Sequence, residues 1–437
     1  MTRPAHRLWL CIAAFVTMAI AMPAGAVPNV APSSRVTAAV VVRAEPTTQS
    51  EALARLRPGE TLPLEIEVPG WYRVTLPDGR TGYVSKRWTD VLPDTAVPLA
   101  PNWRVHFVDV GTGLATFVEG PDFALVYDAG SNDDDALGTG NRFLAYLRRV
   151  RPDLQVMDHM ILSHPHTDHV ALLPDLFGAY EIRNVWESGR LHDICGYRSF
   201  LARIEAEPAI IYHDANPAGQ VHTVSLPAKA ACEGPTVPFS VSIPRGQQIV
   251  RGLVVPLGAG ARMTFLHADP HPYPDDVNRN SVPIRLDLGA TRLLFMGDAE
   301  AGERNDPHSD PPRPNSIEGQ LLDCCAAALA AHVLVAGHHG SKTSSRAPFL
   351  DAVRATTFIV SSGPKKYSGT MLPDPSIVQA MDSRGDVWRT DFDDPHCQTD
   401  IAKIGPDNDN ESGGCDNILV RISGDGLMLV NYERIPD

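Results

Sequence analysis

The chain has 437 residues, which is long enough for two domains that each bury a core of their own. Its 38 Lys and Arg against 52 Asp and Glu give a formal net charge of −14 at pH 7, so a broad basic surface for holding nucleic acid is not expected. Cleavage of a phosphodiester stays open, because a metal site can supply positive charge locally.

The first 26 residues are expected to be a secretory signal. Arg3 and Arg7 precede an apolar run at 8–22, and the small residues Ala24-Gly25-Ala26 follow it as a cleavage site. An uncleaved anchor is the alternative, although the run is short for a membrane span. No later stretch is apolar enough to cross a bilayer. We therefore expect an exported protein, periplasmic or secreted, that has no transmembrane segment once the signal is removed.

The cysteines outside the signal are even in number. They are Cys195, Cys232, Cys324, Cys325, Cys397 and Cys415. An even set without any CxxC spacing in an exported chain favours disulfides over metal thiolates. Cys397 and Cys415 flank a polar, turn-rich segment and could close its base, and Cys195 with Cys232 is a second expected pair.

Residues 27–96 are expected to form a small all-β domain. Alternating apolar and polar residues at 36–43, 62–68, 71–76 and 81–85 predict short strands, with turns at Pro58-Gly59 and Asp78-Gly79. With its PGE, GWYRV and DGRTGYV segments, this region resembles a bacterial SH3-like domain. The resemblance implies a partner such as a cell-wall peptide or another protein. Trp71, Tyr72 and Tyr83 are the candidate contacts, or else they fill the core of the domain.

From Trp103 onward, apolar strands alternate with helical patterns. The expected strands lie at 104–110, 123–130, 159–164, 292–298, 332–339 and 357–363, and the expected helices lie at 141–150 and 320–332. Most of these strands end in polar residues. This order predicts a layered α/β domain over residues 102–437, with function at the carboxyl ends of the strands.

Three histidines and an aspartate fall within six positions after one of these strands. His164 and His166 are two residues apart, so their rings can converge on one side of an extended turn that Pro165 keeps from being helical. Asp168 and His169 follow, where a helix is expected to start. Nitrogen and oxygen donors of this kind suit a borderline divalent cation such as zinc or manganese.

Two further strands end in residues of the same kind. Asp298 directly follows the strand at 292–296, and His338 and His339 follow the strand that begins at 332. Three strand ends that carry metal-ligand residue types are expected to meet along one edge of a sheet.

At this point residues 103–437 resemble a metallo-β-lactamase-fold domain, and in particular the ComEC-type competence nuclease branch. The matching motifs are HPHTDH at 164–169, VDVG at 108–111 with DAG at 128–130, NS at 280–281 with GD at 297–298, HHGSKTSS at 338–345 and RTD at 389–391. They occur in the order of the family. The resemblance implies an αββα sandwich, which follows the SH3-like domain.

Matching positions imply a ligand set for one or two divalent ions, zinc first and manganese second. In that set His164 and His166 hold one ion, Asp168, His169 and His338 hold the other, and Asp298 bridges the two. His339 could coordinate in place of His338 or protonate a leaving oxygen. Asp168 is also expected to orient an attacking water, so Asp168 and His339 are the catalytic candidates.

Asp128 and Asn280 would brace the site without holding an ion. Asp128 would orient histidines by hydrogen bonding. Asn280 lies in the neighbourhood where the family usually has a third histidine, and its presence weakens the first site. A late family histidine is also missing, because Tyr367 is followed by SGTMLPD, so no role transfers to that position.

Hydrolysis by activated water is the expected reaction, with a phosphodiester as the leading substrate class. Ser341, Lys342 and Ser344 follow the histidines and could contact phosphate oxygens. A nuclease and a small-molecule phosphodiesterase both fit. Two alternatives remain open: a metal-dependent amide or ester hydrolase of lactamase type, and a non-catalytic protein that binds metal or cell wall.

Overall fold

The computed structural model describes residues 29–33, 36–68, 70–92, 102–132, 138, 141–217, 219–232, 237–274, 276–363, 366–367, 369–391, 417–424 and 426–432. The chain divides into two compact units, Met1–Val97 and Pro98–Asp437. The expected signal and the Cys397–Cys415 pair lie outside the described residues. Within the described part, no helix combines the length and the apolar character that a membrane crossing needs.

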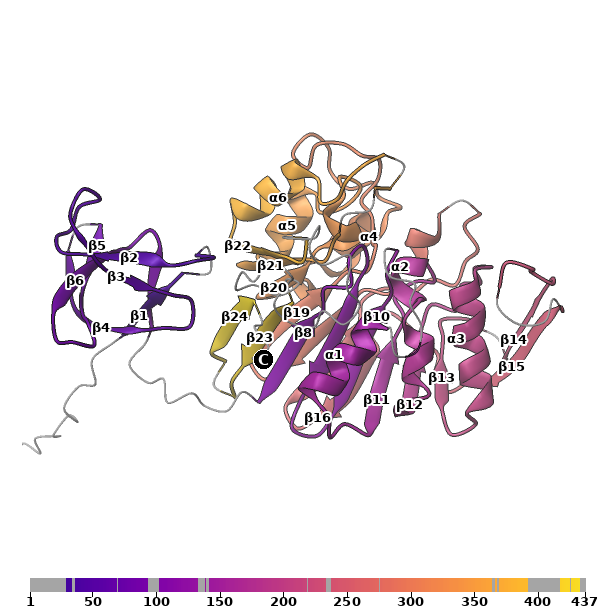
Figure 1. Ribbon diagram of the computed structural model, residues 1–437. Helices are drawn as coiled ribbons and strands as arrows, with labels where there is room; N and C mark the ends of the chain where they lie inside the picture. The colour runs from indigo at the N-terminus through magenta and orange to yellow at the C-terminus, as the bar shows by residue number, and fades with distance from the viewer. Residues whose placement is uncertain are drawn as a thin grey trace, which may run out of the picture. The chain divides into compact units, whose positions relative to one another are not determined.

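The first unit is entirely β-structure, as predicted, and is drawn in indigo in Figure 1. Its strands are β1 (Asn29–Pro32), β2 (Val40–Arg43), β3 (Ala52–Leu56), β4 (Leu62–Val68), β5 (Trp71–Thr75), β6 (Thr81–Ser85) and β7 (Thr89–Leu92). They form one antiparallel sheet in the order β3-β2-β6-β5-β4-β1-β7. Val30, Val42, Val74 and Val84 are fully buried between the strands, and Tyr72 is half-buried against this core.

Two sheets form the middle of the second unit. The first contains β8 (Trp103–Phe107), β9 (Ala115–Glu119), β10 (Ala124–Ala129), β11 (Val156–Ile161), β12 (Glu181–Trp186), β13 (Ile211–His213), β23 (Ile418–Ile422) and β24 (Met428–Tyr432). Its order is β13-β12-β11-β10-β9-β8-β23-β24, and the pairs from β13 to β10 are parallel.

The second sheet has the order β16-β17-β18-β19-β20-β21-β22, with parallel pairs from β19 to β22. Its strands are β16 (Val254–Gly258), β17 (Ala261–Phe265), β18 (Ile284–Leu288), β19 (Thr291–Phe295), β20 (Val333–Val335), β21 (Thr357–Val360) and β22 (Asp386–Arg389). Apolar side chains of the two sheets pack between them, including Phe107, Tyr127 and Phe295.

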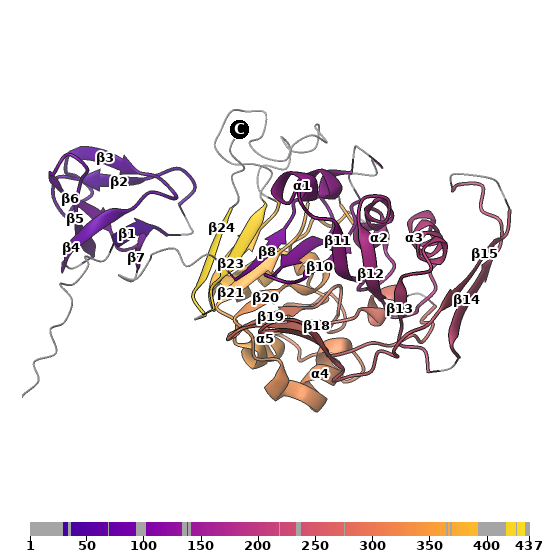
Figure 2. The ribbon, with the colours of Figure 1, turned by 90° about the horizontal axis from the view of Figure 1, so that it is seen from below.

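Helices cover the outer face of each sheet, which is visible in Figure 2. On the first sheet lie α1 (Arg142–Val150), α2 (Thr167–Val170) and α3 (Cys195–Ala206), and on the second lie α4 (Ile317–Cys325), α5 (Ala347–Val353) and α6 (Pro375–Asp382). The predicted αββα sandwich is confirmed. Burial of an apolar face against each side of both sheets is what holds the four layers together.

Helix α1 illustrates how the sequence specifies a covering helix. Asn141 caps its start, because the side chain accepts a hydrogen bond from the Leu144 N–H. Phe143 and Leu147 stand four positions apart on the buried face, and two arginines occupy the last turn, where positive charge suits the helix dipole.

Helix α4 differs from its prediction at both ends. It begins at Ile317, because Ser316 caps it by accepting a hydrogen bond from the Gly319 N–H, and it ends at Cys325. The backbone of Cys325 leaves the helical region there (φ −145°, ψ 20°), and a disulfide joins this residue to Cys324. The alanines that follow form only a short 3-10 helix, Ala326–Ala328, so the predicted helix was too long at this end.

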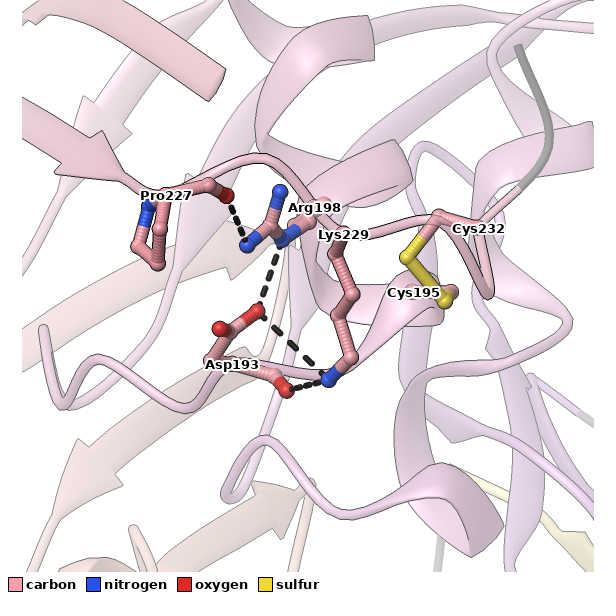
Figure 3. The surroundings of a disulfide bond; sticks show 6 residues. All are labelled: Asp193, Cys195, Arg198, Pro227, Lys229 and Cys232. Atoms are coloured by element: carbon pink, nitrogen blue, oxygen red, sulfur yellow. Dashed lines mark hydrogen bonds and ion pairs between the residues drawn. A yellow bond between two sulfur atoms is a disulfide. The ribbon is translucent and has the colours of Figure 1, made fainter. Parts of the chain in front are cut away.

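The hairpin β14 (Val221–Leu226) and β15 (Phe239–Pro244) lies beside α3, and a second disulfide anchors the segment after β14 to the start of that helix. The predicted Cys195–Cys232 pair is confirmed. Figure 3 shows that ionic contacts reinforce it: Arg198 donates to the Pro227 carbonyl (2.7 Å) and pairs with Asp193, which also contacts Lys229.

Candidate metal centre

The turn after β11 carries four of the predicted ligands. Pro165 follows His164 and the backbone stays extended up to His166 (φ −81°, ψ 157°), which is the residue that precedes α2. Asp168 and His169 lie in the single turn of α2. His164, Asp168 and His169 are buried, whereas His166 is half-buried and borders a cavity.

One group of donors consists of His164, His166 and Asp298. The His164 Nε2 and His166 Nδ1 atoms lie 3.0 Å apart, and His164 Nε2 lies 3.5 Å from Asp298 Oδ2. One donor atom from each of the three residues falls within 4.8 Å of the others, a spacing that could hold an ion.

The second group consists of Asp168, His169 and His339, and Asp298 also reaches it. Asp298 Oδ1 lies 3.1 Å from His169 Nε2 and 3.5 Å from His339 Nε2, and His339 Nε2 lies 3.5 Å from Asp168 Oδ2. The two oxygens of Asp298 therefore face different donor groups, which is the geometry of a bridging carboxylate.

The separations of the donor atoms suit ligands around a metal ion better than hydrogen bonds between the side chains. Four ligands held tetrahedrally at about 2.0–2.1 Å from an ion stand about 3.3 Å apart, close to the separations around Asp298 Oδ1. That oxygen, His169 Nε2 and His339 Nε2 are all buried without a hydrogen-bond partner. Buried polar atoms seldom stay unpaired, so three of them facing one point indicate a cation-binding position.

The electrostatics of the site agree with this reading. Burial alone would raise the pKa of Asp298, but the neighbouring imidazoles of His169 and His339 outweigh burial and hold that pKa well below its ordinary value. Burial lowers the pKa of His169, yet Asp298 and Asp128 raise it well above the usual range. The centre thus holds an ionised Asp298 beside imidazoles, and a bound cation could take the place of the proton that balances its charge.

Buried partners fix the orientation of two ligand histidines. Asp128 Oδ2 lies 2.8 Å from His169 Nδ1, and Asp128 Oδ1 accepts a hydrogen bond from the Ser163 N–H at 2.6 Å. His339 Nδ1 lies 2.8 Å from the Ser361 carbonyl oxygen, to which it can only donate. In both rings Nε2 is left free to face the centre, as in many metal-bound histidines.

The structure places His339 in the second donor group and leaves His338, the residue that the resemblance had favoured, at the edge of the centre. Both have left-handed backbone angles (φ 48° and 53°), so the chain turns sharply and sends the two rings to different sides. His338 Nδ1 lies 2.9 Å from Glu300 and 2.7 Å from Thr343 Oγ1, while its Nε2 stays 3.9 Å from Asp298 Oδ2.

Other predicted site residues lie in the supporting loops. Asn280 is buried, and its side-chain amide donates to the carbonyl oxygens of Asp269 and His271. These bonds hold the preceding loop in place and do not involve the histidines of the two donor groups. The Ser344 hydroxyl donates to the Gly337 carbonyl (2.6 Å), and the Ser341 hydroxyl accepts from Arg304 (2.9 Å). Both hydroxyls are buried and shape their own loop, which leaves half-exposed Lys342 as the candidate for substrate contact.

Tyr367 reaches the centre although its motif had assigned it no role. Its hydroxyl donates to Asp168 Oδ2 at 2.5 Å, and its ring stacks on His339 with centroids 6.1 Å apart. Burial, and then the charge of Asp168, raise the pKa of Tyr367 far above its ordinary value, so the phenol stays a hydrogen-bond donor. Because Tyr367 lies 199 residues from Asp168 in the chain, only the fold reveals this contact.

A cavity of about 470 Å³ opens beside the first donor group. His166 forms part of its wall, together with His192, Asp276, Asn278 and Glu300. A volume of this size suits an organic ligand. No spacing or motif in the sequence had pointed to His192 or to the acidic residues of this wall.

Family models match both units of the chain. One described as "Metallo-beta-lactamase superfamily" matches residues 108–363, and one described as "Bacterial SH3 domain" matches residues 38–90. "Recombination protein 2" of Haemophilus influenzae is 25% identical over 282 residues, covering 64% of this chain and 26% of that protein. An uncharacterized protein of Escherichia coli K12, YcaI, is 21% identical over 301 residues, covering 68% of this chain and 30% of the relative.

The chain thus spans less than a third of either relative. Among solved structures, the metallo-beta-lactamase fold protein YhfI of Bacillus subtilis is 12% identical and has a TM-score of 0.36, with 66% of this chain and 96% of that chain covered. The metallo hydrolase Igni18 of Ignicoccus hospitalis is 11% identical with a TM-score of 0.37, covering 66% and 95% of the two chains.

Proposed function

Because the chain belongs to the metallo-beta-lactamase superfamily of metal-dependent hydrolases, we propose that it is an exported phosphodiesterase or nuclease. The observation that carries the proposal is the position of Asp298 between two groups of donor atoms, which suits two neighbouring divalent ions. Bound there, such ions would supply Lewis acidity, a water that ionises near neutral pH, and charge to stabilise both oxygens of an in-line displacement. Zinc suits these nitrogen and oxygen donors best, with manganese as the second choice.

The protein's own residues would then divide the remaining work. His164, His166 and Asp298 would hold one ion, and Asp168, His169 and His339 the other. The hydrogen bond from Tyr367 would hold Asp168, whose Oδ2 atom also faces His339, in position to bind an ion or to orient water. Ser163 and Asp128 keep the first turn rigid, so the donors are held in place before substrate arrives.

We assign export and localisation to the amino-terminal part of the chain. The apolar run at 8–22 supports secretion, and the Cys195–Cys232 disulfide suits an oxidising compartment. The SH3 domain would hold the hydrolase near its substrate by contacting a cell-wall peptide or a protein, without entering the chemistry.

The test combines metal content with hydrolysis of a bis-aryl phosphate ester. The parent protein should bind up to two ions and hydrolyse the ester, and His166→Ala should lower the metal content and reduce turnover by at least about tenfold. His308→Ala is the matched control, because His308 is exposed and belongs to neither donor group. Turnover that survives His166→Ala would refute the site.

Panels of esters and lactams separate the competing functions. Faster hydrolysis of an amide or ester than of any phosphodiester would favour a lactamase-like enzyme on the same centre. Bound metal with no turnover on any panel would favour a binding protein.

A further inference from the structure

The cavity beside the first donor group is acidic, which is unusual for a site that would receive a phosphodiester. Asp276 and Glu300 line it, and no Lys or Arg is among its lining residues. Glu300 is also near His338 (2.9 Å) and accepts from Asn278 Nδ2 (3.4 Å). A polyanion extending from the metal centre into this space would meet two carboxylates.

The remaining wall reinforces the preference for a positive group. Burial, and after it the charge of Glu300, raise the pKa of Asp276, and the opposing charges of Arg279 and His338 offset this only in part. A cation between the two carboxylates would therefore relieve an unfavourable pair. Asn278 is 9% exposed, and its Oδ1 atom is buried without a hydrogen-bond partner.

The size of the space identifies the kind of cation. Among the described residues only two groups of three or more potential ligands converge within 4.8 Å, and Asp276 and Glu300 belong to neither. Their carboxylates are therefore not arranged around a bare ion. A volume of about 470 Å³ instead accommodates an organic group whose several N–H bonds can reach separate acceptors.

We propose that this cavity binds a primary ammonium group of the substrate, so that the enzyme prefers phosphodiesters of amino alcohols. Asp276 and Glu300 accept the N–H bonds, with Asn278 beside them in the wall, while the phosphate would occupy the metal centre at His166. This inference rests on the proposed phosphodiesterase function and narrows it. It disfavours a long nucleic acid running through the cavity.

Two matched esters test the preference. Hydrolysis of p-nitrophenyl 2-aminoethyl phosphate adds water at phosphorus, breaks the aryl P–O bond and releases p-nitrophenolate and 2-aminoethyl phosphate. The p-nitrophenyl propyl ester replaces the ammonium by a methyl group of similar size. We expect kcat/KM for the aminoethyl ester to be at least about tenfold higher, the range of a hydrogen bond to a charged group.

Two variants test whether the preference for the aminoethyl ester arises in this cavity. Asp276→Asn should bring the ratio of the two kcat/KM values close to one, whereas Glu303→Gln should keep the parental ratio, because exposed Glu303 does not line this cavity. A parental ratio near one would overturn the ammonium site and leave the phosphodiesterase proposal standing. So would stoichiometric uptake of an additional divalent ion that Asp276→Asn abolishes.

Calorimetry keeps the two proposals separable. If neither ester is hydrolysed, the proposed function fails, and binding of 2-aminoethyl phosphate compared with propyl phosphate still decides the cavity. Tighter binding of the amine that Asp276→Asn removes would support the ammonium site, and equal binding would contradict it.

Discussion

At the scale of single residues, the centre depends on how each donor is held as well as on which donors are present. Asp128 has a left-handed backbone (φ 55°), which turns the chain at the end of β10 and aims its carboxylate at both Ser163 and His169. Tyr367 orients Asp168 in the same way, and the Ser361 carbonyl orients His339. Such partners contribute to metal affinity and rate without touching an ion.

Tyr367→Phe tests this arrangement most directly. Loss of the hydroxyl frees Asp168 Oδ2, so we expect kcat for an aryl phosphodiester to fall by about tenfold to a hundredfold while the ring still packs on His339. Thermal unfolding should change little, which separates positioning from folding. Tyr83→Phe, in the first unit, is the control, and parental kcat in Tyr367→Phe would contradict the role.

Residue identity was predictable from the sequence only where a motif stands at a strand end. His164, His166, Asp168, His169 and Asp298 do, and the structure brings them together. The choice between His338 and His339 was not predictable, because it depends on two consecutive positive φ angles. Ser341 and Ser344 carry the right chemistry for phosphate, but the Arg304 side chain and the Gly337 carbonyl occupy their hydroxyls.

At the scale of elements, tight approach of backbone segments sets the position of α2. A Cβ at Gly130 would stand 2.3 Å from the His169 N atom, and one at Gly113 would stand 2.1 Å from the Gly130 carbonyl oxygen. Glycine at both positions therefore lets the loops after β8 and β10 pack directly against the turn that carries Asp168 and His169.

Gly130→Ala should consequently displace that turn. We expect a loss of about 1–3 kcal/mol in the free energy of unfolding, as in other overpacked interiors, and a lower metal content at equal protein concentration. Denaturant titration and elemental analysis measure the two effects. Gly178→Ala is the control, because the nearest atom to its added Cβ is 3.9 Å away; equal losses in both variants would show that the close approach is not responsible.

Strand β9 ends in a carboxylate that links the first sheet to α1. Burial would raise the pKa of Glu119, but hydrogen bonds from His106 and Arg151 outweigh it and lower the pKa to about 2 from 4.5. A lowered folded-state pKa means that this contribution is complete above pH 4.5 and is lost as the pH falls toward 2.

Between pH 5 and pH 3 the parent should therefore lose about 1–3 kcal/mol more stability than Glu119→Gln does, measured by urea unfolding. Exposed Glu181 supplies the comparison: Glu181→Gln should keep the parental pH dependence. If the free energy of unfolding changes equally with pH in all three proteins, Glu119 does not cause the loss of stability in acid.

At the scale of the whole molecule, ligands that are far apart in sequence meet because strand ends of the two sheets lie close together. In the first sheet β10 and β11 deliver Asp128 and His164, and in the second β19 and β20 deliver Asp298 and His339. The strand ends were expected to meet, but the prediction that they share one edge of a single sheet was wrong. The acidic cavity was not predictable, because its wall comes from the loops around His192, Asp276 and Glu300, which share no periodicity or motif.

The two compact units lead to a prediction about the division of labour. Removing residues 27–96 should leave kcat/KM for a small aryl phosphodiester within a few-fold of the parent, because each unit has its own buried core. The same truncated chain should bind isolated cell-wall material less tightly. A collapse of turnover in a truncated protein with a parental unfolding transition would show that the SH3 domain takes part in the chemistry.

The disulfide between Cys195 and Cys232 has a practical consequence for anyone preparing this enzyme. His192 stands three residues before the crosslink, so the wall of the cavity is tethered only in molecules whose thiols have been oxidised. Expression in a reducing cytosol, or storage with a thiol reagent, would yield a mixture of molecules with and without this disulfide. Non-reducing electrophoresis should resolve the two forms, and substrate preference ought to be compared only between batches in which one band remains.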